Sequence, residues 1–366
     1  MILFFICSAC ILLQILFAVW MLWTGPSSAG PFRKEEQRVL PLSIIICARN
    51  EAPQLRKNLE SVLQQDHPDF EVIVVNDRSE DDTATVLDSF SAYPNLRCIH
   101  IPVTEEAALP GKKFALSKGV AAAKFDRLLL CDADCTPATT AWARLMAAPL
   151  QDKTEIVAGY GAYERHKGWL NLFIRWETLH TFIQYCSFTR SGMPYMAVGR
   201  NLACTKSTLQ QAQAQPLWAS MPSGDDDLLM RLAANRHNTK IVQDPAAFTC
   251  STPKLSFAAW LAQKQRHLST GKLYRPHIKL LLSLYGFSHG LMWLLFGLLC
   301  LAGNAYLVST MMLLRCLLCW SMWAASAQAM RENSLVLFLP LCDVGWALYN
   351  LILSPYIFFK TKKQWT

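Results

Sequence analysis

The distribution of apolar positions divides the chain into three parts. Residues 1–23 form an apolar run without any charged side chain, and such a run can cross about 30 Å of hydrocarbon as a helix. Near the other end, residues 280–330 are apolar apart from Arg315, and residues 335–359 form another apolar stretch. Between the two ends, from about residue 40 to 277, short apolar runs alternate with amphipathic ones. The pattern predicts a folded domain between an N-terminal membrane anchor and a C-terminal membrane region.

The middle part contains four short runs that are apolar nearly throughout: LSIIIC (42–47), FEVIVVND (70–77), LRCIHI (96–101) and RLLLCDAD (127–134). Helix-forming stretches separate these runs, at residues 56–65, after residue 79 and at residues 114–123. Strands that are apolar on both faces and alternate with helices are typical of a parallel sheet that is covered on both sides. The predicted fold class is therefore α/β, with a mostly parallel, doubly wound sheet.

Polar side chains follow three of the four predicted strands. Asn50 and Glu51 come after the first strand, Asp77 ends the second, and Asp132 and Asp134 end the fourth. Each of them alone is compatible with an ordinary turn or helix cap. Ligands of open α/β sheets bind at the carboxyl ends of the strands, so three polar strand ends favour a nucleotide pocket.

The segment LLLCDADCTP (128–137) is compatible with two chemistries. A phosphatase of the haloacid-dehalogenase type uses Asp-x-Asp-x-Thr at its nucleophile, and a nucleotide-sugar transferase uses Asp-x-Asp to hold a divalent cation and a ribose. A phosphatase core would begin at this strand, whereas here two βα units precede it. Such a phosphatase also needs a later pair of acidic metal ligands, and the acidic residues of SGDDDLL (223–229) lie too close together in sequence for that pair. The transferase interpretation uses all of these elements and is preferred.

Seven segments together resemble the family 2 glycosyltransferases, which are inverting enzymes of the GT-A fold, over about residues 40–271. The matching segments are CARNEA (47–52), VVNDRSEDDT (74–83), LPGKKFALSKG (109–119), LLLCDADC (128–135), VGRNLACTKSTL (198–209), SGDDDLLMRL (223–232) and QKQRH (263–267). The resemblance implies a GT-A domain, which is Rossmann-like with a mostly parallel sheet. It also implies the roles of individual residues.

On the donor side, the resemblance implies that the nucleotide is bound by Asn50, Glu51, Asp77, Lys112 (with Lys113 as the alternative) and Asp132. Asp134, together with Asp132, would hold Mg²⁺ or Mn²⁺. Both cations prefer such oxygen ligands, and a cation there neutralises the charge that develops on a diphosphate leaving group.

On the acceptor side, Gly199 and Asn201 resemble the floor of the acceptor site, although Gly199 also fits a plain turn. Asp225 falls at the position of the general base in this family, and Asp226 is the alternative. A carboxylate there can take the proton of an attacking hydroxyl. The competing interpretation is an acidic helix start that the helix dipole stabilises.

The QKQRH segment resembles the Q-x-x-R-W element of the family at Gln263, Arg266 and His267. His267 replaces the Trp that stacks on a growing polymer, which puts processive synthesis in doubt. Arg266 retains the geometry to clamp a diphosphate. The surrounding residues 252–278 also form a basic amphipathic stretch suited to a membrane surface.

The charges around the apolar ends bear on topology. Arg33, Lys34 and Arg38 follow the first run and favour a cytoplasmic position for the middle domain. A cleaved signal peptide is less favoured, because no basic residue precedes the run. Lys360, Lys362 and Lys363 would lie outside after three C-terminal crossings, so the parity of these spans stays open. Arg315 and Asp343 are each costly alone in lipid, which suggests an intramembrane pair, with a partly interfacial segment as the alternative.

Composition agrees with a membrane protein. Of the 366 residues, 52% are hydrophobic and only 17% are charged, and the net charge of +8 suits an anionic membrane surface. Cys316 and Cys319, two of the thirteen cysteines, form a CxxC in an apolar segment without an accompanying His pair, so reduced thiols are expected and a zinc site is not. No basic–aromatic pattern favours nucleic acid as a partner.

These observations define four expected segments: an anchor at 1–24, a cytoplasmic GT-A domain at 40–251, an interfacial segment at 252–278, and a membrane region of two to three helices at 279–360. The expected activity is transfer of a sugar from a nucleotide-diphospho-sugar, UDP in preference, to a lipid or lipid-linked acceptor in the lipid bilayer. If the protein is bacterial, it would reside in the inner or plasma membrane. The alternatives are a processive polysaccharide synthase and a non-catalytic membrane subunit that binds nucleotide sugars.

Overall fold

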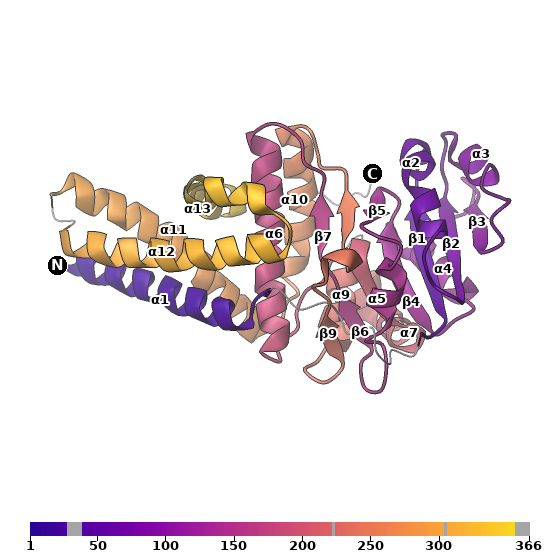
Figure 1. Ribbon diagram of the computed structural model, residues 1–366, viewed down its shortest axis with the longest axis horizontal. Coiled ribbons are helices and arrows are strands. Elements are labelled where there is room, and N and C mark those ends of the chain that lie inside the picture. Colours follow the sequence, from indigo (N-terminus) through magenta and orange to yellow (C-terminus); the bar gives the residue numbers. More distant parts are fainter. Residues whose placement is uncertain (28–38, 222–223, 304–305, 356–366) are drawn as a thin grey trace. The chain divides into compact units, whose positions relative to one another are not determined.

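The computed structural model describes residues 1–27, 39–221, 224–303 and 306–355 (Figure 1). The chain forms two compact units. One comprises Met1–Ser28, Arg165–Phe188 and Lys254–Lys362, and the other comprises Ala29–Glu164, Thr189–Pro253 and the last residues. The basic residues used above for topology, Arg33, Lys34, Arg38, Lys360, Lys362 and Lys363, lie outside the described residues.

The second unit is built on a seven-stranded sheet with the order β3-β2-β1-β4-β8-β6-β9 (Figure 1). Its strands are β1 (Leu42–Ala48), β2 (Phe70–Asp77), β3 (Leu96–Ile101), β4 (Arg127–Asp132), β6 (Ile156–Ala158), β8 (Leu202–Thr205) and β9 (Thr239–Ile241). The first four run parallel, and β8 is antiparallel to β4 and β6. The predicted α/β fold with a mostly parallel sheet is confirmed.

Buried apolar residues explain why these segments form strands and helices. Every residue of β1 is buried, as expected for a central strand covered on both faces. The helix α2 (Ala52–Leu63) begins with Pro53 in its first turn and buries Leu55, Leu59 and Val62. The predicted helix at 56–65 therefore starts four residues earlier than expected, because the proline fits the first turn.

The remaining elements of this unit include six further α-helices and a second, small sheet among the described residues. The helices are α3 (Thr83–Asp88), α4 (Lys113–Ala122), α5 (Trp142–Ala147), α7 (Lys206–Gln213), α8 (Pro216–Ala219) and α9 (Asp225–Ala233). A second sheet has the order β5-β10-β7, with β5 (Cys135–Pro137), β7 (Gly161–Tyr163) and β10 (Thr249–Ser251). The predicted strand at 127–134 ends at Asp132, and Asp134 lies in the turn between β4 and β5.

The first unit is helical. Its elements are α1 (Ile2–Thr24), α6 (Trp169–Arg190), α10 (Phe257–Gly271), α11 (Pro276–Leu301), α12 (Tyr306–Ala329), a 3₁₀ helix (Asn333–Phe338), α13 (Leu339–Leu348) and a π-helical turn (Tyr349–Leu353). Among the described residues, four segments are long and apolar enough to cross a membrane: Ile2–Thr24, Pro276–Leu301, Val308–Ala329 and Asn333–Leu353. Arg165–Phe188, which the sequence interpretation places in the 40–251 domain, groups with this unit.

The expected pair of Arg315 and Asp343 is present in the helical unit. The guanidinium of Arg315, on α12, forms an ion pair with the carboxylate of Asp343, on α13, and neither side chain has any exposed surface. His289 Nε2 of α11 lies 2.7 Å from the same carboxylate, and Trp320 Nε1 donates to it at 3.0 Å. One buried charge pair thus connects three of the apolar helices.

Removing one member of this pair should destabilise the helical unit strongly. In Asp343→Leu the buried guanidinium of Arg315 loses its counter-charge, which costs roughly 3–5 kcal/mol. We expect a clear fall in the thermal unfolding midpoint of the full chain in detergent. The double variant Asp343→Leu/Arg315→Met removes both charges and should recover much of the loss. Equal midpoints for the single and double variants would contradict this assignment.

Candidate active site

The loops that follow β1 and β2 are joined by hydrogen bonds. Asn50 has a left-handed backbone (φ 55°), which Asn tolerates better than most residues, and its Oδ1 accepts from the Glu80 amide at 2.8 Å. The Asn50 amide in turn donates to Ser79 Oγ at 2.9 Å. Glu51 immediately precedes α2, and its amide donates to Thr83 Oγ1 at 3.0 Å. Asn50 and Glu51 are thus held at the carboxyl edge of the sheet.

Asp77, at the end of β2, is fully buried and paired with the next residue. Arg78 Nε donates to its Oδ1 at 2.7 Å and Arg78 Nη2 to its Oδ2 at 3.1 Å. This hydrogen bonding to the Asp77 carboxylate raises the pKa of the Arg78 guanidinium. Arg78 also has a left-handed backbone (φ 54°). The sequence interpretation overlooked Arg78, because a residue that pairs with its own neighbour leaves no pattern in spacing.

Asp132 and Lys112 come together from different elements. Asp132 ends β4 beside Cys47 of β1, and the ammonium of Lys112, at the start of α4, forms an ion pair with its carboxylate. Burial disfavours the charged form of Lys112, but the carboxylates of Asp132 and Asp225 outweigh it and raise the lysine pKa well above its usual value. A permanent positive charge therefore lies at the first Asp of the Asp-x-Asp segment.

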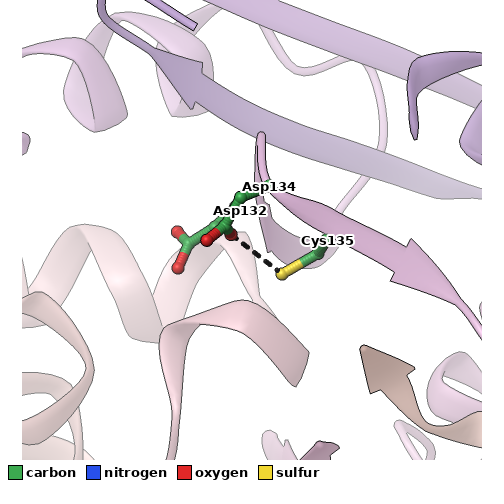
Figure 2. A group of neighbouring side chains, drawn as sticks. All are labelled: Asp132, Asp134 and Cys135. Atoms are coloured by element: carbon green, nitrogen blue, oxygen red, sulfur yellow. Dashed lines mark hydrogen bonds between the residues drawn. The ribbon is translucent and has the colours of Figure 1, made fainter. Parts of the chain in front are cut away.

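Asp132, Asp134 and Cys135 form a group of potential metal ligands (Figure 2). One ligand atom from each lies within 4.8 Å of the others. The Cys135 thiol donates to Asp134 Oδ1 at 3.5 Å and lies 3.0 Å from Ser251 Oγ. Burial raises the pKa of Cys135 well above its usual value, so the sulfur is a neutral thiol. The two carboxylates are therefore the donors that fit a hard divalent cation.

The three acidic residues at the start of α9 have different surroundings. Asp226 Oδ2 accepts from the Gly199 amide, and its Oδ1 accepts from the Asp227 amide, both at 2.8 Å. Burial and the neighbouring Asp225 raise the pKa of the Asp226 carboxyl to about 6. The charge of Asp225 also raises the pKa of Lys112. Both oxygens of Asp226 are engaged with backbone, which suits a supporting residue.

Asn201 lies in the core. Its Nδ2 donates to the carbonyls of Tyr160 and Ala247, and its Oδ1 accepts from Trp142 Nε1, all at 2.9 Å. The side chain has no exposed surface. The sequence interpretation places Asn201 at the acceptor floor, and its buried side chain could support such a site only indirectly, through these hydrogen bonds. Gly199 is the residue of this segment that contacts a candidate catalytic carboxylate.

Arg200, between these two residues, was not identified from the sequence. Its Nη2 donates to the Gly161 carbonyl at 2.6 Å, and its guanidinium lies 4.1 Å from the centre of the Tyr163 ring. Burial opposes its charge, but Tyr163, Cys135 and Asp134 outweigh burial and raise its pKa. Arg200 therefore brings positive charge toward Asp134.

The last predicted site residues belong to the helical unit. Gln263, Arg266 and His267 all lie on α10, and the His267 side chain is outside the described residues. These three residues therefore belong to a different unit from the site at the strand ends.

Sequence comparison agrees with this geometry. Residues 43–200 match the family described as glycosyl transferase family 2, and residues 129–330, more than half of the chain, match glycosyl transferase family group 2. The poly-beta-1,6-N-acetyl-D-glucosamine synthase of Staphylococcus epidermidis is 29% identical over 102 residues, covering 28% of this chain and 24% of the relative. The 4,4'-diaponeurosporenoate glycosyltransferase of Staphylococcus aureus is 38% identical over 95 residues, covering 26% of this chain and 24% of the relative.

Each of these two matches spans only about a quarter of the curated relative. A mannosyltransferase from Pyrobaculum calidifontis, solved in complex with GDP-Man and Mn²⁺, aligns over 96% of this chain and 99% of its own, with a TM-score of 0.58 and 16% identity. At that identity the likeness concerns the fold. The family matches, the mostly parallel sheet and the apolar helices together establish that the chain belongs to the family 2 glycosyltransferases and is membrane-anchored.

Proposed function

We propose that this enzyme transfers a sugar, with inversion, from a UDP-linked sugar to a lipid or lipid-linked acceptor. The observation that carries the proposal is the meeting of two sets of groups at one edge of the sheet. The Asp132–Asp134 carboxylates with Lys112 form one set, and the acidic start of α9 forms the other. The first set suits a nucleoside diphosphate with a cation, and the second suits a hydroxyl that must lose a proton.

On the donor side, Asp132 and Asp134 would hold Mg²⁺ or Mn²⁺, and Lys112 would add a positive charge beside Asp132. A cation bound there neutralises charge on the departing diphosphate. The Pyrobaculum mannosyltransferase was solved with Mn²⁺ and a nucleotide sugar, which supports the assignment by similarity of fold. Asn50, Glu51 and Asp77, at neighbouring strand ends, would line the nucleotide.

On the acceptor side, Asp225 would act as the general base. The acceptor oxygen attacks the anomeric carbon, its proton passes to the carboxylate of Asp225, and the bond to the diphosphate oxygen breaks on the opposite face. Asp226 would act beneath it by holding the Gly199 amide. This division of roles is favoured because Asp226 already accepts a backbone hydrogen bond at each oxygen.

The acceptor is proposed to be lipid because four apolar segments accompany the catalytic unit. The similarity to the 4,4'-diaponeurosporenoate glycosyltransferase of S. aureus supports this choice. The similarity to a poly-N-acetylglucosamine synthase favours a second candidate, a processive polysaccharide synthase. We further propose that the catalytic unit faces the cytoplasm. A reporter fused to the C-terminus would fix the parity of the spans.

A donor and acceptor screen tests the proposal. The purified full chain would be incubated with a panel of UDP- and GDP-sugars, Mn²⁺ and membrane lipid extract, and the lipids would be analysed by mass spectrometry. We expect one lipid to gain a single sugar from a UDP donor. Long polymers would indicate the processive alternative, and donor binding without any product would indicate the non-catalytic subunit.

Replacing Lys112 should weaken donor binding. Lys112→Met removes a charged hydrogen-bonding group worth roughly 1.5–3 kcal/mol, so the donor KM should rise about 10–100-fold. The matched control is Lys118→Met in α4, since Lys118 is 43% exposed, pairs with the partly exposed Glu105 and lies 5.1 Å from the centre of the Phe114 ring. An unchanged donor KM in Lys112→Met would exclude Lys112 from the donor site.

A further inference from the structure

Lys113 and Lys112 are adjacent in sequence but contact different parts of the α/β unit. Lys113 is the first residue of α4 and has no exposed surface. Its Nζ donates to the carbonyls of Trp218 and Met221, both at 2.6 Å, and lies 5.3 Å from the centre of the Trp218 ring. A buried ammonium is unfavourable unless it is hydrogen-bonded, so these carbonyls explain how the charge is tolerated.

The two carbonyls belong to a segment that leads toward the acidic start of α9. Trp218 lies in α8 and is fully buried, and Met221 follows that helix. The last carbonyls of a helix lack intrahelical partners, which makes this end of α8 a suitable acceptor for an ammonium. The helix α8 contacts α9, which carries Asp225 and also packs against α7.

Electrostatics connects Lys113 to the same acidic residues. Burial lowers the pKa of Lys113 to about 8, and the charges of Asp225 and Asp226 oppose this shift. Lys113 is therefore a buried counter-charge near both candidate carboxylates. Of the two lysines at the start of α4, Lys112 pairs with Asp132 and Lys113 donates to the carbonyls of Trp218 and Met221.

We propose that Lys113 is a positioning residue that fixes α8, and through it the acidic start of α9, relative to the donor lysine Lys112. This inference deepens the proposed function and rests on it for its kinetic consequence. Lys113 is assigned no contact with either substrate. Its structural consequence, a rigid link between α4 and α8, stands independently of which sugar or lipid the enzyme uses.

The two lysines should give opposite kinetic results. Lys113→Met keeps the length of the side chain but leaves the carbonyls of Trp218 and Met221 without their ammonium partner. Misplacement of the base should lower kcat about 10–100-fold while the donor KM stays within about twofold of wild type. Lys112→Met should instead raise the donor KM. A rise of the donor KM in Lys113→Met to the level of Lys112→Met would overturn the positioning role.

Hydrogen exchange followed by mass spectrometry tests the link without reference to activity. In the full chain in detergent, Lys113→Met should accelerate exchange about tenfold or more in peptides covering 216–221 and 225–233, since local opening becomes easier. Peptides covering 42–63 should exchange as in wild type, and the exposed variant Lys118→Met should match wild type throughout. Unchanged exchange at 216–233 would refute the proposal.

Two further cases are a Lys113→Met variant that is destabilised throughout and a wild-type protein without activity. If Lys113→Met exchanges rapidly throughout the α/β unit, Lys113→Gln replaces it, because the amide keeps two N–H donors without the charge. Faster exchange at 216–221 and 225–233 in Lys113→Gln would then support the proposal, and unchanged exchange there would refute it. If wild-type protein shows no transferase activity with any donor, the proposed function fails, while the exchange result still decides whether Lys113 links α4 to α8.

Discussion

Asp134→Ala is expected to abolish metal-dependent transfer, with a loss of at least about 10³-fold in kcat/KM. Asp134 lies in the turn after β4, and its carboxylate is one of two that fit a hard cation beside the neutral thiol of Cys135. A bound cation contributes several kcal/mol of charge stabilisation at a diphosphate leaving group, which corresponds to a loss of this size. Transfer would be measured with the donor identified in the screen.

Metal binding provides a second measurement for the same variant. Titration of Mn²⁺ into the full chain, followed by the electron paramagnetic resonance signal of free Mn²⁺, should show a weakened site in Asp134→Ala. Asp88→Ala is the matched control, because Asp88 is an exposed carboxylate at the end of α3. Full activity and normal Mn²⁺ binding in Asp134→Ala would remove Asp134 from the metal site.

Asp225→Asn is expected to lower kcat by about 10²–10⁴-fold with donor binding nearly intact, as for loss of a general base. Asn keeps the shape of the side chain but cannot accept the proton of an attacking hydroxyl. Donor affinity would be measured by calorimetry with UDP and Mn²⁺, and kcat by transfer to lipid. A large increase in the dissociation constant of UDP would place Asp225 on the donor side instead.

Asp226→Asn separates the two candidate bases. We expect a smaller loss of kcat, because Asp226 is proposed to hold the Gly199 amide and not to take the proton. If Asp226→Asn has the larger effect, Asp226 is the base. The acid limb of the pH–rate profile gives an independent criterion. A limb near pH 6 that disappears in Asp226→Asn would also identify Asp226, since burial raises the pKa of its carboxyl to about 6.

The long strands could be predicted from local pattern. The segments at 42–47, 70–77 and 96–101 are found as β1, β2 and β3 with nearly the same bounds. Strands covered on both faces, as β1 and most of β2 are, need an unbroken apolar run, and such a run is visible in the sequence. The edge strand β3 is only partly buried, and its run contains Arg97 and His100. The strands β6, β7 and β9 contain three residues each, which is too short for any periodicity to show.

Only part of the candidate site could be predicted from the sequence. The carboxylates at the strand ends follow from the rule that parallel strands bring their ends to one edge. Contacts between distant segments do not follow from any such rule. Examples are the Asp226–Gly199 hydrogen bond and the burial of Asn201 against Trp142.

Two neighbouring lysines show most clearly what the sequence alone could not predict. From the sequence, Lys112 and Lys113 were alternatives for a single role near the nucleotide. In the fold, Lys112 pairs with Asp132 and Lys113 donates to the carbonyls of Trp218 and Met221. Adjacent residues at a helix start point in different directions, and what each meets depends on segments about twenty and one hundred residues away. The strands, the apolar helices and the family segments could be predicted because each depends on residues that are close together in the sequence. The contacts of an individual side chain depend on residues that are distant in the sequence, so only the tertiary structure determines them.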